Sequence, residues 1–155
     1  MTRYRATSEG LVPFTAEEEA FADLEEAAAT ALPLRQASVW EQIKAHRDRL
    51  SDTGGYLVTV SGVSKWFHSD AKSKTQQLGL LISGAAVPPV PWKTMDGSFV
   101  TMSQAWAAAI FAAAAAQDIA IFGAAEVHKA AMLAADDPTA YNWRSGWPAT
   151  YVEGA

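Results

Sequence analysis

Three pieces of sequence decide the fold: KWFHSDAKSKTQQLGLLISGA at residues 65–85, WKTMDGSFVTMSQ at 92–104, and AAEVHKAAM at 124–132. The first two each join a strand-like run to the start of a helix. The third closes an alanine-dominated segment that carries very few charges. A helix of this kind needs to bury most of its circumference. The pattern therefore predicts packing and assembly, and no recognisable set of catalytic residues lies within it.

Two β-hairpins are expected, with a leucine-rich helix between them. Residues 56–61 alternate as a strand does, Gly62 permits a reversal, and residues 63–68 return. Asp70 is placed to cap the helix that follows, and Gly84 to end it. Residues 85–91 contain three prolines and are expected to form an irregular connection.

The second hairpin is expected over residues 92–102. Asp96-Gly97 is the strongest short-range turn signal in the chain, because a type I′ turn needs positive φ at both central residues. Thr101 and Gln104 have the spacing of a capping box, which predicts that a long helix begins there. The helix is expected to run to about residue 135, before an Asp-Asp-Pro sequence.

Two helices are expected upstream of the hairpins. Residues 1–14 are expected to be a lead-in, with Gly10 and Pro13 marking turns. Thr15 and Glu18 form a capping box for a first helix, and Pro33 is expected to stop it. A second helix over residues 38–50 opens with a capping box of its own.

The predicted fold class is therefore α+β: an N-terminal helical pair, two short β-hairpins each followed by a helix, and a long Ala-rich C-terminal helix. The expected units are a lead-in and helical arm at 1–53, a hairpin–helix domain at 54–135 and an aromatic tail at 136–155. Trp143 and Trp147 argue against disorder in the tail, which is expected to dock on the body or on a partner.

Composition excludes several classes of function. The 155 residues are 50% apolar and 19% charged, and the net charge is −5. Lys and Arg are scattered, so no basic stripe exists for nucleic acid. There is no cysteine, which excludes thiol chemistry. The longest unbroken apolar run, residues 105–116, is shorter than the ~20 residues of a membrane span, so no membrane insertion is expected. The N-terminus does not resemble a signal peptide, which predicts synthesis in the cytoplasm.

Catalytic and metal sites are not expected. His46, His68 and His128 lie on different predicted elements, and none has a metal-binding partner at i+4. His68-Ser69-Asp70 contains the residue types of a catalytic triad, but adjacency in sequence is not triad geometry. Ser69 and Asp70 are better explained as the start of a helix. The sequence predicts a protein that is not an enzyme and needs no cofactor.

Aromatic residues on the two hairpins have two possible explanations. Trp66 and Phe67 fall on the first hairpin, and Trp92 and Phe99 on the second. Cross-strand packing would stabilise such short ribbons. The alternative is an exposed surface that stacks on carbohydrate or on a partner protein.

The long helix is the strongest candidate for an interface. Between residues 103 and 135 only Asp118, Glu126 and Lys129 are charged. Its large apolar residues point in several directions at 100° per residue, so one face cannot bury them all. We expect an oligomer or heteromer interface; the alternative is a core helix wrapped by the rest of the chain. The predicted interface residues are Trp106, Ile110, Phe111, Ile119 and Phe122, with Trp143 and Trp147 from the tail.

With these residues considered, the portion from about Gly54 to Ala134 resembles a domain of unknown function encoded in tail modules of tailed bacteriophages and prophages. The matching text is KWFHSDAKSKTQQLGLL, WKTMDGSFVTMS and IFAAAAAQDIAIFGAAEVHKAAM, in that order. The VPFTAEEEA at residues 12–20 is similar to the start of many small tail-module proteins. Residues 85–91 depart from the family pattern.

The resemblance implies a non-enzymatic protein of the tail fibre or tail tip, either a structural component or a chaperone for fibre assembly. The implied partners are the tail fibre or other tail proteins, and the implied location is the virion tail after synthesis in the host cytoplasm. No catalytic residues follow from the resemblance. A carbohydrate-binding module for host recognition is the alternative function.

Overall fold

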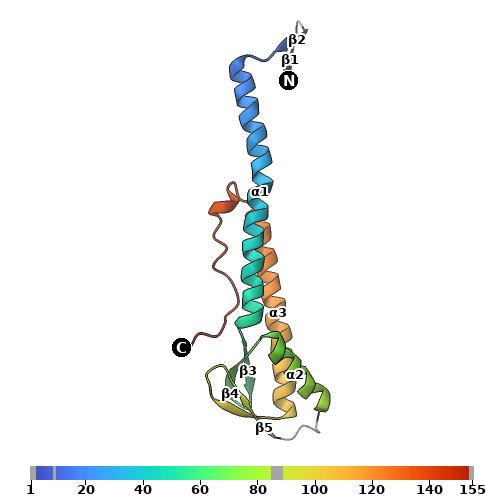
Figure 1. Cartoon of the computed structure of the whole chain (residues 1–155), viewed down its shortest axis with the longest axis vertical. Coiled ribbons are helices and arrows are strands. Elements are labelled where there is room, and N and C mark those ends of the chain that lie inside the picture. Colours follow the sequence, from blue (N-terminus) through green and yellow to red (C-terminus); the bar gives the residue numbers. More distant parts are fainter. Residues whose placement is uncertain (1–2, 9, 85–88, 154–155) are drawn as a thin grey trace.

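A long helix and a shorter antiparallel partner form the axis of the molecule, and a small hairpin layer lies at one end (Figure 1). The computed structural model describes residues 3–8, 10–84 and 89–153. The elements in chain order are β1 (Tyr4–Thr7), β2 (Gly10–Pro13), α1 (Ala16–Thr53), β3 (Tyr56–Val60), β4 (Val63–Phe67), α2 (Ala71–Ser83), β5 (Val90–Lys93), β6 (Phe99–Met102), α3 (Gln104–Leu133) and the 3-10 helix η2 (Pro138–Ala140). The predicted α+β class is confirmed.

The expected N-terminal helical pair is wrong, because α1 is one helix that contains Pro33. The capping box of Thr15 and Glu18 is present at its start. Residues 38–41 lie inside the helix and cap nothing. Pro33 deprives the carbonyl of Ala29 of its helical donor, but both residues are exposed, so water can bind that carbonyl. The residues on either side of the proline favour helix, and the helix continues across it.

The expected lead-in contains secondary structure that was not predicted. β1 and β2 form an antiparallel hairpin at the far end of α1, in which Tyr4 pairs with Pro13 and Thr7 with Gly10 (Figure 1). Arg3 and Arg5 of this hairpin bind carboxylates of α1. The docking of this hairpin on α1 therefore uses contacts between residues more distant in sequence, which local patterns do not reveal.

The first predicted hairpin is confirmed as β3 and β4. Its two-residue loop consists of Ser61 at φ 51° and Gly62 at φ 82°, between the paired Val60 and Val63. Positive φ at both central positions is the requirement of a type I′ turn.

The type I′ turn predicted at Asp96-Gly97 is wrong, because Gly97 has a φ of 79° but Asp96 has no positive φ. The loop has five residues, from Thr94 to Ser98, between the paired Lys93 and Phe99. The Asp96 carboxylate accepts from the Thr94 hydroxyl and the Ser98 amide, at 2.5 and 3.0 Å, and so braces the longer loop.

The two inner helices begin where a side chain caps the first turn. Asp70 caps α2 and Gly84 ends it, as predicted. α3 begins later than predicted, because Ser103 is its N-cap and Thr101 belongs to β6. β5 begins at Val90, so residues 90–91 of the expected irregular connection are strand. Residues 85–88 lie outside the described part of the chain.

The core has two parts. At the hairpin end, Tyr56, Phe67 and Met102 pack against Trp106 and Ile110 of α3. The Tyr56 hydroxyl is bonded to the side chain of buried Gln77, and burial raises the pKa of Tyr56 to about 12, so it stays a donor at neutral pH.

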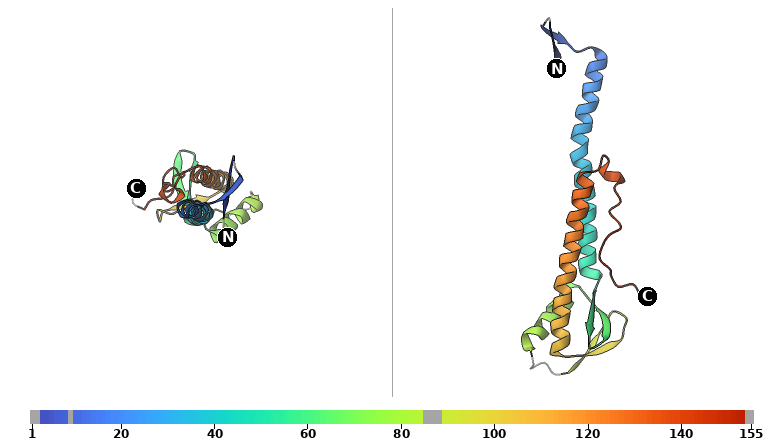
Figure 2. Two further views of the ribbon diagram at one scale, coloured as in Figure 1. Left: turned by 90° about the horizontal axis from the view of Figure 1, so that it is seen from above. Right: turned by 180° about the vertical axis from the view of Figure 1, so that it is seen from behind.

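The second part of the core lies between α1 and α3, which are antiparallel and side by side in both views of Figure 2. Val39 and Ile43 meet Ala125 and Met132 there. The C-terminal tail runs back beside these helices (Figure 1). Its Trp143 and Trp147 pack against this cluster, and the prediction that the tail docks is confirmed.

Candidate functional site

α3 presents one apolar line to the core of its own chain. Ile110, Ile121 and Met132 are spaced eleven residues apart, and all three are fully buried. Eleven residues make three helical turns, so these side chains form a line nearly parallel to the helix axis. Trp106 and Ala125 extend the same buried side.

A second apolar line on α3 faces solvent. Phe111, Phe122 and Leu133 repeat the same eleven-residue spacing and are 49%, 48% and 48% exposed. Ile119, between the two phenylalanines, is 73% exposed. We call these four residues the outer stripe. Alanines fill many of the positions around them, and the three charged residues of α3, Asp118, Glu126 and Lys129, share this side of the helix.

α1 carries one apolar stripe that is only half covered. Its members alternate steps of seven and four residues and are Phe21, Ala28, Leu32, Val39, Ile43 and Leu50. Val39, Ile43 and Leu50 are buried. Phe21 is 64% exposed, and Ala28 is exposed as well. We call residues 16–34 the arm; it extends past the end of α3 (Figure 1), and within the described part of the chain Phe21 and Ala28 of this stripe stay exposed while Leu32 is partly buried.

The arm is acidic, with carboxylates both opposite its apolar stripe and beside it. Residues 16–34 hold six Asp or Glu and no Lys or Arg. Arg3 binds Glu19, Asp23 and Glu26 at 3.1, 2.6 and 2.6 Å. At 100° per residue these carboxylates lie about 180° around the helix from Phe21. Arg5 is paired with Glu18, which lies about 60° from Phe21 around the helix, so the hairpin is tied to both sides of the arm while Phe21 itself stays exposed.

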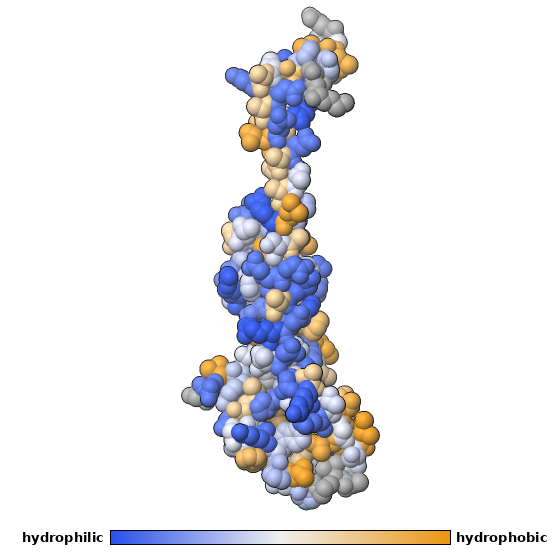
Figure 3. Space-filling model, viewed as in Figure 1, coloured by the Kyte–Doolittle hydropathy of each residue, from blue (hydrophilic) through white to orange (hydrophobic). Residues whose placement is uncertain are grey.

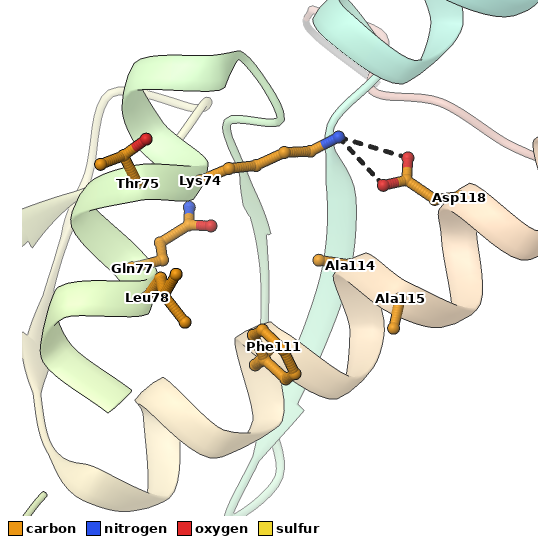
Figure 4. Close-up of a pocket in the computed structure, with 8 residues that line it drawn as sticks. All are labelled: Lys74, Thr75, Gln77, Leu78, Phe111, Ala114, Ala115 and Asp118. Carbon is orange, nitrogen blue, oxygen red and sulfur yellow. Dashed lines mark hydrogen bonds and ion pairs between the residues drawn. The ribbon is translucent and has the colours of Figure 1, made fainter. Parts of the chain in front are cut away.

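A groove lies between α2 and α3 (Figure 4). Leu78 and Phe111 form its apolar walls, and its volume is about 360 Å³. The Lys74 ammonium closes one end through an ion pair of 3.1 Å with Asp118. Asp118 also accepts from the Ser51 hydroxyl at 2.8 Å. The charged groups at this end satisfy each other, so the groove offers shape and apolar contact more than reactive groups.

Two histidines flank the docked tail. The rings of His46 on α1 and His128 on α3 lie 4.8 and 5.0 Å from the Trp147 ring. Arg49 donates to His46 Nδ1 at 2.9 Å, which requires that nitrogen to be unprotonated. Burial lowers the pKa of both histidines, so both are neutral at pH 7. The cluster holds the tail in place and lacks the carboxylate or nucleophile of a catalytic group.

A polar hollow of about 750 Å³ lies beside the loop of the second hairpin. Trp66 and Tyr151 line it, with ring centroids 6.2 Å apart and an interplanar angle of 62°. The hydrogen bond from Lys65 has the largest effect on the pKa of Asp96, and together with the one from Thr94 it holds that pKa well below its usual range. Asp96 is therefore ionised and committed to its own loop, which leaves it unsuited to proton transfer.

The structure divides the predicted interface residues into three groups. Trp106 and Ile110 lie in the core of their own chain. Trp143 and Trp147 are partly buried by the tail's docking on α1 and α3. Of the predicted set, Phe111, Ile119 and Phe122 are exposed and available to a partner.

The hairpin aromatics divide as well. Phe67 is fully buried, and Trp92 packs against the hairpin-end core, so cross-strand packing explains both. Phe99 is 63% exposed, and Trp66 lines the polar hollow. The four residues do not form one flat aromatic surface.

Sequence reasoning missed the half-covered stripe of α1. The signal was present, because Phe21, Leu32 and Ile43 are eleven residues apart, as are Ala28, Val39 and Leu50. Because a break was expected at Pro33, the residues before and after it were assigned to different helices, and the repeat across the proline was not recognised. The C-terminal half of the stripe is buried and the half on the arm is exposed because α3 ends between them, and the position of that end is known only from the structure.

Two further observations bear on the class of function. Within the described part of the chain, no group of three or more His, Cys, Asp or Glu is placed to hold a metal ion. α3 is long and apolar enough, by length and composition alone, to cross a membrane. One such helix is weak evidence, since core helices of soluble proteins have the same composition. The absence of membrane insertion stays a prediction.

Comparison with known proteins gives one match. No curated protein and no solved structure matches the chain significantly. The family model described as a domain of unknown function (DUF4376) matches residues 33–145. The match begins inside α1 and ends in the docked tail, and it therefore contains the helical pair, both inner hairpins and the outer stripe. The chain belongs to the DUF4376 family.

Proposed function

We propose that this protein is a non-enzymatic assembly protein that acts through contact with other protein chains. The observation that carries the proposal is the outer stripe of α3, where four large apolar side chains are about half exposed or more. Apolar surface of this extent, arranged in a line on a helix, is typical of an interaction site. The narrow, elongated shape supports the proposal, because it leaves much of each helix accessible (Figure 1).

The identity of the partners rests on the sequence resemblance alone. On that basis we propose a bacteriophage tail protein, associated with the tail fibre or tail tip as a structural component or as a fibre assembly chaperone. The proposed location is the virion tail, reached after synthesis in the host cytoplasm.

Co-expression with a tail-fibre protein from the same genome tests the proposal. The two proteins are expected to co-purify, and Ile119→Glu on the outer stripe is expected to reduce recovery at least tenfold. Val63→Glu is the matched control, because Val63 is also exposed, at 48%, but lies at the β3–β4 turn. Equal recovery with wild type and Ile119→Glu would contradict the stripe as the contact surface, and no co-purification at all would contradict the fibre assignment.

Mass spectrometry of purified particles separates the two versions of this role. A structural component is expected at a stoichiometric copy number. An assembly chaperone is expected to be absent from mature particles but to raise the yield of soluble fibre.

The polar hollow favours a second candidate, a carbohydrate-binding module. Sugar rings stack on aromatic faces, and Trp66 and Tyr151 supply two rings beside polar groups of Asp96 and Glu153. Titration with host polysaccharide tests this, with Trp66→Ala expected to abolish binding and Phe99→Ala, on exposed β6 outside the hollow, expected to retain it. Equal binding by both variants, or none by wild type, would contradict the candidate.

A further inference from the structure

We infer that the protein forms a two-fold dimer by exchange of arms, in which the arm of each copy lies along the outer stripe of the other. This inference rests on the proposed function in one respect, since it takes the outer stripe as a protein contact surface; if a second copy occupies that surface, Ile119→Glu would lower recovery of the fibre protein by breaking the dimer that the fibre binds. The partner is a second copy of this chain. Four features of the described residues lead to it.

The first feature is a shared period. Within one chain, the lower stripe of α1 packs against α3 residues such as Met132. Both sides of that contact repeat every eleven residues. The arm continues the α1 repeat with Phe21 and Leu32, and the outer stripe continues the α3 repeat with Phe111 and Phe122. Helices of equal period stay in register along their length, so an arm could stay in register with an outer stripe, although in the two-fold arrangement it would run parallel to α3 and not antiparallel as α1 does within the chain.

The second feature is length. At 1.5 Å per residue the 19-residue arm is about 28 Å long, and the outer stripe from Phe111 to Leu133 extends about 33 Å. One arm therefore covers most of one stripe. The β3–β4 hairpin and α2 lie near the other end of α3 and do not block the upper part of the stripe (Figures 1 and 4).

The third feature is charge. Two arms packed on each other would bring acidic helices together, because the arm has no basic residue. The charges of α3 are already neutralised in pairs: Asp118 with Lys74, and Glu126 with Lys129. Arg47 of α1 also lies over the Phe122 ring at 4.6 Å. The outer stripe therefore accepts an acidic helix without like-charge repulsion, whereas a second arm does not.

The fourth feature is topology. α1 and α3 run in opposite directions, and the arm projects past the C-terminal end of α3 (Figures 1 and 2). A second copy turned end over end places its own arm beside the first α3 and presents its own α3 to the first arm. The two contacts are equivalent, so the assembly closes at two copies.

Apolar patches are visible along the arm and again near α2 on the face shown in Figure 3.

Cross-linking of single-cysteine variants tests this arrangement directly, because the chain has no cysteine of its own. One chain carries Leu24→Cys on the arm, and another carries Ile119→Cys on α3. The two are refolded together and treated with a bis-maleimide of about 10 Å reach. Arm exchange predicts a cross-linked dimer from the mixture and little or none from either variant alone. A strong product from Ile119→Cys alone would show α3 packed on α3 and would overturn the inference.

Light scattering after size exclusion gives the second readout. Wild type is expected at twice the 16.6 kDa chain mass. Phe21→Glu and Ile119→Glu are each expected to be monomeric with unchanged helix content, and Val63→Glu is expected to stay dimeric. A wild-type monomer that still retains the fibre protein through Ile119 would overturn the dimer and leave the proposed function standing. A monomer that retains no partner would overturn both.

Discussion

The hydroxyl of Tyr56 is hydrogen-bonded to the side-chain oxygen of Gln77, inside the hairpin-end core. Tyr56 is 2% exposed and Gln77 4% exposed, so water cannot replace either partner. Tyr56→Phe should therefore lower the free energy of unfolding by about 1–3 kcal/mol, the cost of an unpaired buried acceptor. Urea denaturation measures this, and Tyr4→Phe, at an exposed position, is the control. An effect of equal size in both variants would contradict the assigned role.

The His46 and His128 pair predicts that the tail is released at acid pH. Burial lowers the pKa of both groups in the folded chain, so the folded state binds fewer protons than the unfolded state. The stability they contribute is therefore complete above the unfolded value of about 6.5 and is lost as the pH falls from there through the lower folded pKa values. Carboxylates with lowered pKa, such as Asp70, lose their contribution only at lower pH.

Fluorescence of the tail tryptophans measures this release. Between pH 7.5 and 5.0 the emission of Trp143 and Trp147 is expected to shift to longer wavelength before the helix signal is lost. The double variant His46→Gln with His128→Gln should remove the shift in that interval, and His68→Gln, on a different element, should not. A shift of the same size in the double variant would contradict the role of the two histidines.

Residues whose effect is local could be predicted from the sequence. Thr15, Asp70 and Gly84 act within one helical turn, and the structure has each where the sequence placed it. The turn type at Asp96-Gly97 was predicted wrongly, because an aspartate side chain also stabilises loops longer than two residues. The meeting of His46 with His128 could not be predicted, since it depends on how α1 and α3 pack.

At the scale of elements, α1 shows where a local rule fails. A proline inside a helix costs about 3 kcal/mol relative to alanine. In α1 this cost falls on an exposed turn that water can solvate, and the helix continues. The expected break hid the single stripe that runs from Phe21 to Leu50, so neither the length of α1 nor its free upper half could be derived from the sequence.

Pro33→Ala should therefore stabilise the arm by up to about 3 kcal/mol. Hydrogen exchange of amides in residues 16–32 is the measurement, because the arm can fray without unfolding the core. Protection is expected to rise in the arm and to stay constant in α3. Lower protection in the variant would show that the proline sets a bend that the arm needs.

At the scale of the whole molecule, the exposed line on α3 is the feature that a single chain does not explain. A long helix with three charges was expected either to form the core or to form an interface. The structure shows both on one helix: Ile110, Ile121 and Met132 are buried in the chain, while Phe111, Phe122 and Leu133 are not. The composition of α3 indicated more apolar surface than one chain can bury, but only the packing of α1 shows which side of α3 remains exposed.

Truncation of the tail tests whether the docked segment supports the helical pair. Removal of residues 141–155 uncovers the cluster around Val39 and Ile43, and loss of Trp147 alone should cost less than the about 3–5 kcal/mol of a core Trp→Ala substitution, because Trp147 is only partly buried. Thermal unfolding followed by circular dichroism measures the loss. An unchanged melting temperature would contradict the structural role of the tail.

Hydrogen exchange of wild-type protein at several concentrations most directly tests whether a second copy covers the arm and the outer stripe. Protection in residues 16–32 and 111–133 is expected to rise together from nanomolar to high micromolar protein, while the buried β3 strand stays constant. Protection of the arm that is independent of concentration, in a chain that remains monomeric throughout, would contradict arm exchange.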